Sequence, residues 1–221
     1  MRRFTSFTLT LLMTLAWLIP AALPADHTAV AQTPAAGVPL AGDFKGTGAS
    51  QIATISDPTD ELGLKIQILE RDAASATEKF SVADWYGAAA GSYDLGRMKW
   101  AATDANFDKK TDLVALYDDG GTSVRLLVFL STGSSFTFMG TSGWWSSTGY
   151  AWSRTKAIIA GNFSAIGNNG LLLVYQYDNY DMRIHYLESD GTRFIYGGNQ
   201  GVYASGPGQY DTARARFVEG R

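Results

Sequence analysis

The chain has 221 residues, a formal net charge of −3 and no cysteine. The absence of cysteine excludes disulfides, thiolate metal sites, cysteine nucleophiles and a lipid anchor on an N-terminal cysteine. The acidic balance, with no basic run beyond Arg2-Arg3, argues against nucleic-acid binding. Hydrophobic residues make up 46% of the chain, and 24 glycines accompany 28 aromatic residues (11 Tyr, 11 Phe and 6 Trp). This composition predicts a folded, β-rich protein.

The first 31 residues read as an export signal. Arg2 and Arg3 precede an apolar run over residues 4–23, and Ala29-Val30-Ala31 has the small-x-small pattern of a signal-peptidase site. We therefore expect a signal peptide at 1–31, a mature domain at 32–221 and a secreted, extracellular protein. An uncleaved membrane anchor is the alternative, which two prolines near the end of the run disfavour. No second hydrophobic stretch follows, so we expect no membrane contact after cleavage.

The rest of the chain contains an internal repeat. Tyr117–Ala157 aligns with Tyr175–Ala215 without a gap, and identical Tyr, Arg, Ser, Gly and Phe residues recur along the alignment. A looser first copy is anchored by Gly42-Asp43-Phe44, which we align with Ala105-Asn106-Phe107 and Gly161-Asn162-Phe163. The alignment predicts three units, at about 38–100, 101–157 and 158–221.

Each unit contains short apolar runs separated by turn residues. In the second unit these runs predict strands at 113–117, 124–130, 136–139 and 156–160. Four strands per unit is the layout of a propeller blade. We therefore predict an all-β fold, a β-propeller-like array of about three four-stranded blades. Closed propellers generally have four to eight blades, so the array is expected to be incomplete, to belong to a longer chain, or to be completed by self-association.

These units resemble a known family. The Gly-Asp-Phe opening, the Phe-Leu-Ser-Thr-Gly-Ser-Ser-Phe run at 129–136, the Trp144-Trp145 pair and Ser153-Arg154-Thr155-Lys156 are similar to FG-GAP/VCBS-type repeats of secreted bacterial proteins. The resemblance covers about residues 38–221. It implies propeller blades in extracellular binding or adhesion modules.

The resemblance also implies a loop in which carboxylates and an asparagine can hold calcium. Alternating oxygen ligands suit this hard cation, and only the second unit keeps enough of them, at Asn106, Asp108 and Asp112. Lys110 stands where a further ligand would be expected. We expect an ordinary polar turn and no cofactor, with calcium at these three residues as the alternative.

The inventory of reactive side chains argues against an enzyme. Beyond residue 31 a single histidine remains, His185, on a predicted strand where the repeat alignment sets it over Leu127. No nucleophile elbow, zinc-protease or phosphate-loop motif occurs. We predict an ordinary strand position for His185 and no catalytic residue.

Aromatic residues are the remaining candidate site. Trp144, Trp145, Tyr150 and Trp152 crowd one turn region of the second unit, where they would stack on a sugar or pack between neighbouring blades. Arg125 and Arg183 recur once per unit and are expected to stack on rings or pair with turn aspartates.

The sequence therefore predicts a secreted, non-catalytic binding module that recognises carbohydrate or another extracellular surface through these aromatics. Its partner would be an extracellular glycan or a surface protein. The alternatives are a structural or protein-interaction scaffold without a small-molecule ligand, and a calcium-dependent adhesion fragment.

Overall fold

The structure is a computed structural model that describes residues 40–58, 62–72, 79–140, 144–163, 169–198, 202–215 and 217. The chain divides into two units, Met1–Gln32 and Thr33–Arg221. The expected signal peptide, 1–31, lies outside the described residues. Within the described part of the chain, no helix is long and apolar enough to cross a membrane.

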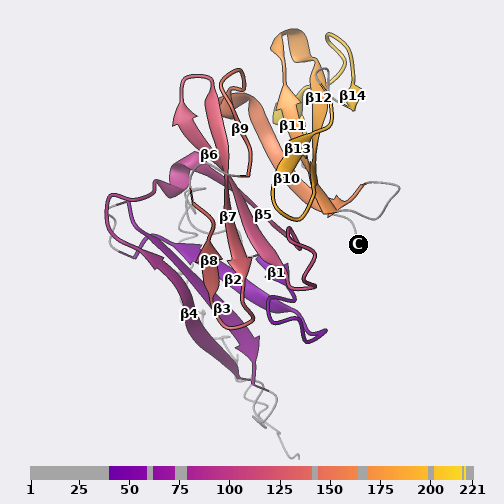
Figure 1. The fold of residues 1–221 in the computed structure, drawn as a ribbon. Helices are drawn as coiled ribbons and strands as arrows, with labels where there is room; N and C mark the ends of the chain where they lie inside the picture. Colours follow the sequence, from indigo (N-terminus) through magenta and orange to yellow (C-terminus); the bar gives the residue numbers. More distant parts are fainter. Residues whose placement is uncertain are drawn as a thin grey trace, which may run out of the picture. The chain divides into compact units, whose positions relative to one another are not determined.

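Three antiparallel sheets follow one another along the chain (Figure 1). The first contains β1 (Leu40–Gly42), β2 (Gln51–Ser56), β3 (Leu64–Arg71) and β4 (Phe80–Ala88). The second contains β5 (Met98–Thr103), β6 (Asp112–Gly120), β7 (Ser123–Ser131), β8 (Phe136–Phe138) and β9 (Ser146–Ser147). The third contains β10 (Thr155–Asn162), β11 (Asn169–Gln176), β12 (Met182–Ser189), β13 (Phe194–Tyr196) and β14 (Tyr203–Ala204). The all-β prediction is confirmed, with four or five strands in each sheet.

Short 3₁₀ turns lie between the sheets, within the third sheet and after it. Leu95–Arg97 precedes β5, Trp152–Arg154 precedes β10, and Thr212–Arg214 follows the third sheet, while Asp178–Tyr180 joins β11 to β12. The side chains of Asp94 and Asp211 accept hydrogen bonds from backbone N–H groups at the start of two of these turns. A 3₁₀ turn therefore follows each sheet, with an aspartate cap at the first and third of these turns and no side-chain cap from Ala151 at the second.

The outer strand differs between the sheets. In the second and third sheets the strand that pairs with β7 or β12 is split into two short pieces, β8 with β9 and β13 with β14. In the first sheet one continuous strand of nine residues, β4, pairs along β3.

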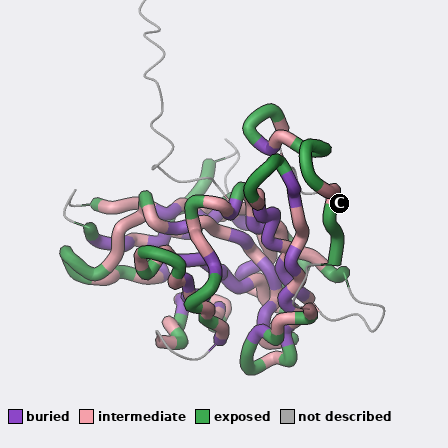
Figure 2. The backbone as a smooth tube through the Cα atoms, turned by 90° about the horizontal axis from the view of Figure 1, so that it is seen from above, coloured by how far each residue is buried: buried purple, intermediate pink, exposed green. Residues whose placement is uncertain are grey.

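Burial follows the position of each sheet. Residues of β2 alternate between buried and half-buried, as expected for a strand with one covered face, whereas Asp112–Tyr117 of β6 are all buried. Leu113, Ala115 and Tyr117 belong to a core shared with the first sheet, while Val114 and Leu116 belong to a core shared with the third. The second sheet is thus covered on both faces. Figure 2 shows buried and exposed residues along the backbone, and β4 is the long strand with most of its residues exposed.

One strand joins a different sheet from the one expected. The run at 156–160 was predicted as the last strand of the second unit, but Thr155–Asn162 pairs with β11 and therefore begins the third sheet. Likewise β5 pairs with β6 and begins the second sheet. Each sheet thus starts with the strand that precedes its Asp- or Asn-containing loop.

Backbone hydrogen bonds also shift the repeat alignment by two residues. The carboxylate of Asp43 accepts hydrogen bonds from the N–H groups four and five residues later, and that of Asp104 does the same. Asp104, and not Asn106, is therefore the counterpart of Asp43. The backbone agrees, since Phe107 has a φ of 64° where Gly46 has 71°. The match of Phe107 with Phe44 that the sequence suggested is wrong.

Candidate functional site

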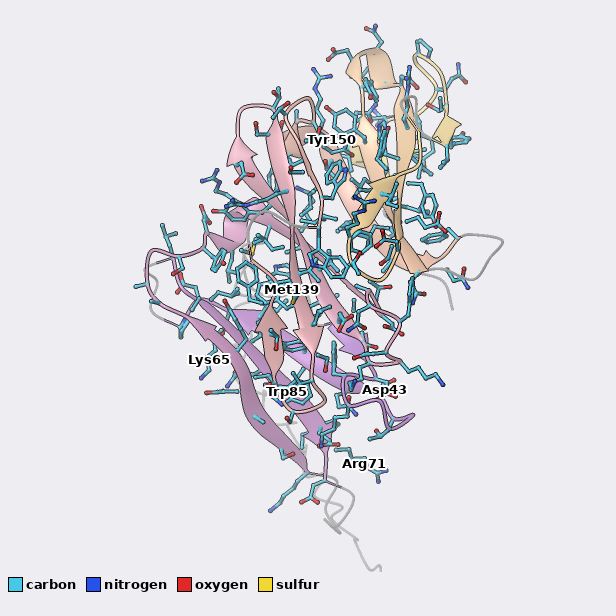
Figure 3. The ribbon with its side chains drawn as sticks, in the orientation of Figure 1. Asp43, Lys65, Arg71, Trp85, Met139 and Tyr150 are labelled. Carbon is cyan, nitrogen blue, oxygen red and sulfur yellow. The ribbon has the colours of Figure 1, made fainter. Side chains whose placement is uncertain are left out.

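The contacts between sheets are built around tryptophan and phenylalanine. Trp85 of β4 packs on Phe136 of β8, with ring centroids 5.3 Å apart, and Trp144 packs on Phe194 of β13 at 5.7 Å. All four side chains are buried. Trp85 lies beside β8 in Figure 3. Large rings contribute most of the apolar area that such a contact removes from water.

Trp144, one of the predicted ligand-binding residues, therefore belongs to the core between the second and third sheets. Only 5% of its surface is accessible. Its carbonyl oxygen accepts a hydrogen bond from the N–H of Phe194, with nitrogen and oxygen 2.8 Å apart. A ligand could reach this ring only if the two sheets separated.

Tyr150 is also buried. Its ring contacts Tyr175 at 4.5 Å and His185 at 5.6 Å, both from the third sheet (Figure 3). Burial raises the pKa of its hydroxyl far above the ordinary tyrosine value, with the hydroxyl of Thr155 acting in the opposite direction. The hydroxyl therefore stays protonated at every physiological pH.

Trp145 and Trp152 are half-buried, so they are the two predicted residues that keep accessible surface. Trp145 meets Tyr150 edge to face at 6.0 Å. The ammonium of Lys99 lies 3.0 Å from the centre of the Trp152 ring, a cation–π contact. Burial, and then the charge of Lys156, lower the pKa of Lys99 to about 8. One face of Trp152 is therefore occupied by a side chain of the second sheet.

The loop after β5 contains the candidate metal ligands. Asp104, Asn106, Asp108 and Asp112 stand at positions 1, 3, 5 and 9 of a nine-residue stretch, a spacing compatible with oxygen ligation. Asp104 was missed because the alignment began two residues later; the alternation of polar residues from 104 was the signal that could have found it.

The oxygens of this loop are occupied within the protein. The carboxylate of Asp112 accepts hydrogen bonds from the N–H groups of Ala105 and Ser131, both at 2.8 Å. Lys110 forms an ion pair with Asp108 at 2.7 Å. Among the described residues, no group of three or more Asp, Glu, His or Cys side chains is arranged to hold a metal ion.

Asp108 and Asp112 of this loop titrate differently. Burial raises the pKa of Asp112 to about 7, although the two backbone donors act to lower it. Partial burial alone would raise the pKa of Asp108, but the bond from Lys110 holds it below the usual value. Asp112 is thus a structural carboxyl at the base of the loop, and Asp108 is the more acidic of the two.

His185 lies in a cluster of tyrosines. It occupies the strand position over Leu127 that the repeat predicts, in β12, and is almost completely buried. Its Nδ1 lies 2.5 Å from the hydroxyl of Tyr196, and its Nε2 lies 3.4 Å from that of Tyr177. Burial, and then the charge of Arg183, lower its pKa. The two tyrosine hydroxyls thus lie within hydrogen-bonding reach of both ring nitrogens.

The recurring cations behave as expected. Arg125 lies over the Tyr117 ring at 5.2 Å and pairs with Asp119 at 3.2 Å. Arg183 lies over Tyr177 at 4.6 Å and pairs with Asp181 at 3.0 Å. Each arginine therefore makes these contacts within its own hairpin, β6–β7 or β11–β12.

A shallow recess of roughly 330 Å³ lies on the first sheet. Its walls include Lys65 and Asp84, which form an ion pair at 2.9 Å, together with Trp85 and Tyr86. The recess is open, and most of Trp85 is turned toward Phe136. It therefore offers a small ligand one charged pair and little enclosure.

Comparisons with protein-family models, curated proteins and solved structures found no match. The class that can be stated is therefore an all-β protein of three antiparallel sheets with aromatic contacts between them. The resemblance to FG-GAP/VCBS-type repeats stays a prediction.

Proposed function

We propose that this protein is a secreted, non-catalytic interaction scaffold of the β-propeller type, without a small-molecule ligand. One observation carries the proposal: at both contacts between successive sheets the recurring aromatics pack on one another, as Trp85 with Phe136 and Trp144 with Phe194. Aromatic residues placed to build a stack of sheets leave function to the outer surfaces of that stack, which suits contact with another macromolecule.

The chemistry of the buried polar residues supports a non-catalytic role. His185 is enclosed by tyrosines, and the hydroxyl of Tyr150, with its strongly raised pKa, cannot act as a base. Asp112 has the pKa of a general base, but two backbone N–H groups already use its oxygens. A catalytic base needs an oxygen directed at substrate.

Carbohydrate binding is the second candidate, and it now rests on Trp145 and Trp152. Both are half-buried, and both lie in the region that the sequence singled out. A sugar ring would stack on the face of Trp152 opposite Lys99, whose ammonium would tune the electron density of the indole.

Intrinsic tryptophan fluorescence, titrated with a panel of polysaccharides, separates the two candidates. For the scaffold we expect a blue-shifted emission that no polysaccharide changes, because the rings contact protein. A saturable shift that is lost in Trp152→Phe but kept in Trp100→Phe would establish the glycan site instead. Trp100 is a suitable control because it is also half-buried, but packs on Phe129 at 5.6 Å.

A further inference from the structure

The two contacts between successive sheets repeat the same arrangement. In the first contact, Phe136 of the second sheet packs on Phe44 and Trp85 of the first sheet, at 5.8 and 5.3 Å. In the second contact, Phe194 of the third sheet packs on Trp144 of the second. Each later sheet thus inserts one phenylalanine into the sheet before it.

A serine on the neighbouring strand faces each inserted phenylalanine, and its hydrogen bond makes the contact directional. The hydroxyl of Ser131 donates to the carbonyl oxygen of Phe44, and that of Ser189 donates to the carbonyl oxygen of Ala105. Ala105 is the residue after Asp104, as Phe44 is the residue after Asp43. Both contacts therefore use the same donor and the same acceptor position, in the same order along the chain.

The first sheet carries the inserting half of this contact, and its side chains there are exposed in the part of the chain that the structure describes. In the strand register Phe80 faces Arg71 as Phe136 faces Ser131 and Phe194 faces Ser189, so Phe80 is their counterpart. The counterparts are 6% and 3% exposed, whereas Phe80 is 55% exposed. Val82, two residues further along β4, is 55% exposed, while its counterpart Phe138 packs on Tyr86 and Tyr93.

The third sheet carries the receiving half, which is also largely exposed; its Phe163 contacts Tyr186 of the same sheet, with ring centroids 6.3 Å apart. Phe163 follows Asn162 as Phe44 follows Asp43, and it is 44% exposed where Phe44 is completely buried. Val202 and Tyr203 stand 58 residues after Trp144 and Trp145; Tyr203 pairs with Ile184 as Trp145 bonds Leu126. Val202 is 59% and Tyr203 is 49% exposed.

We infer that these two faces bind one another between two copies of this chain, head to tail. Phe80 of one copy enters between Phe163 and Val202 of the other, and Val82 meets Tyr203. Arg71 stands where Ser131 and Ser189 donate, and its guanidinium supplies N–H donors for the carbonyl oxygen of Phe163.

The occupant is a second copy because the chain forms this contact twice within itself. The first sheet carries a further inserting half, and the third sheet carries a further receiving half. A different partner would have to reproduce that geometry. Two copies joined at both ends bring six sheets together, within the four to eight of closed propellers. Head-to-tail contacts close into a ring when the rotation per sheet permits. The inference is independent of whatever other molecule the scaffold binds.

Light scattering coupled to size-exclusion chromatography, on the purified protein from about 1 to 200 µM, tests this inference. We expect a dimer. Phe80→Asp and Phe163→Asp should each weaken the dimer roughly 30-fold or more, the range of a central interface residue. Ile195→Asp is the matched control: Ile195 is 45% exposed, lies in β13 and takes no part in the predicted contact. It should leave the dimer intact.

Mixing the two aspartate variants distinguishes a lost contact from a damaged fold. Phe163→Asp keeps the face with Phe80, and Phe80→Asp keeps the face with Phe163. An equimolar mixture should therefore recover a heterodimer through one intact contact. A monomeric wild-type protein, a dimer that survives either aspartate variant, or a mixture that stays monomeric overturns the inference. A monomer would leave the fluorescence test of the scaffold unaffected.

Discussion

Replacing Trp144 by alanine measures whether this ring is core or ligand surface. Only 5% of the surface of Trp144 is exposed, and its ring packs on Phe194. A buried tryptophan removes about 200 Å² from water, and at about 25 cal/mol per Å² this corresponds to about 5 kcal/mol. Measured Trp→Ala changes in cores cost about 3–5 kcal/mol. We therefore expect Trp144→Ala to lower the free energy of unfolding by about 4 kcal/mol.

The assay is urea unfolding followed by far-UV circular dichroism, with Trp152→Ala as the reference. Trp152 is half-buried, and one face of its ring contacts Lys99. Removing this ring in Trp152→Ala should therefore lower the free energy of unfolding by about 1–2 kcal/mol. The m-value should stay the same in both variants if unfolding remains two-state. A Trp144→Ala protein within about 1 kcal/mol of wild type, combined with lost polysaccharide binding, would refute the packing argument.

Three further changes test the contacts between and within the sheets. Ser131→Ala and Ser189→Ala should each cost about 1–3 kcal/mol in the same unfolding assay, because each leaves a buried carbonyl without its donor; unequal costs would contradict the equivalence of the two contacts. Asp112 keeps its proton to about pH 7 when folded, against 3.8 ordinarily, so stability should fall as pH rises from about 4 to 7, by up to about 4 kcal/mol. Asp112→Asn should remove that part of the slope, and an unchanged slope would refute the raised pKa. Calcium at about 10 mM, above the affinity range of extracellular modules, should not change the melting temperature, whereas a rise that is lost in Asp108→Ala would support the adhesion alternative.

The strands could be predicted from the sequence, but their assignment to sheets could not. Apolar runs and glycine turns mark β6, β7 and β8 clearly, and the 58-residue shift recurs in the register of His185 with Leu173 and Leu127 with Ala115. A strand at a repeat boundary pairs equally well, by pattern alone, with the sheet before it or after it. The backbone direction after each 3₁₀ turn decides between them, and no residue type records that direction.

The alignment error has a local cause. Phe107 matches Phe44 in residue type, yet it adopts a left-handed turn conformation that a glycine, Gly46, takes in the first repeat. The hydrogen bonds that recur in both repeats therefore identify equivalent positions in this loop better than residue type does. The same misalignment left Asp104 out of the predicted metal ligands.

The burial of the predicted aromatic site was equally hidden. Trp144 and Trp145 are adjacent in a region of Gly, Ser and Thr, a context typical of a surface loop. One ring turns between the sheets and the other stays half-buried, because neighbouring residues of an extended segment point to opposite sides. The sequence showed that these aromatics are close together in the chain but could not tell which face each ring would occupy.

The second sheet, covered on both faces, has a consequence for how this protein is made. During synthesis β5 to β9 leave the ribosome before the third sheet, so Val114, Leu116, Leu126 and Val128 are not covered by that sheet until β10 to β13 have been made. A nascent or proteolysed chain ending near Ser147 would present this row of aliphatic side chains to solvent and to other chains, a surface prone to aggregation. We therefore expect the second sheet to become stable only once the third sheet has been made, so that the repeats fold together.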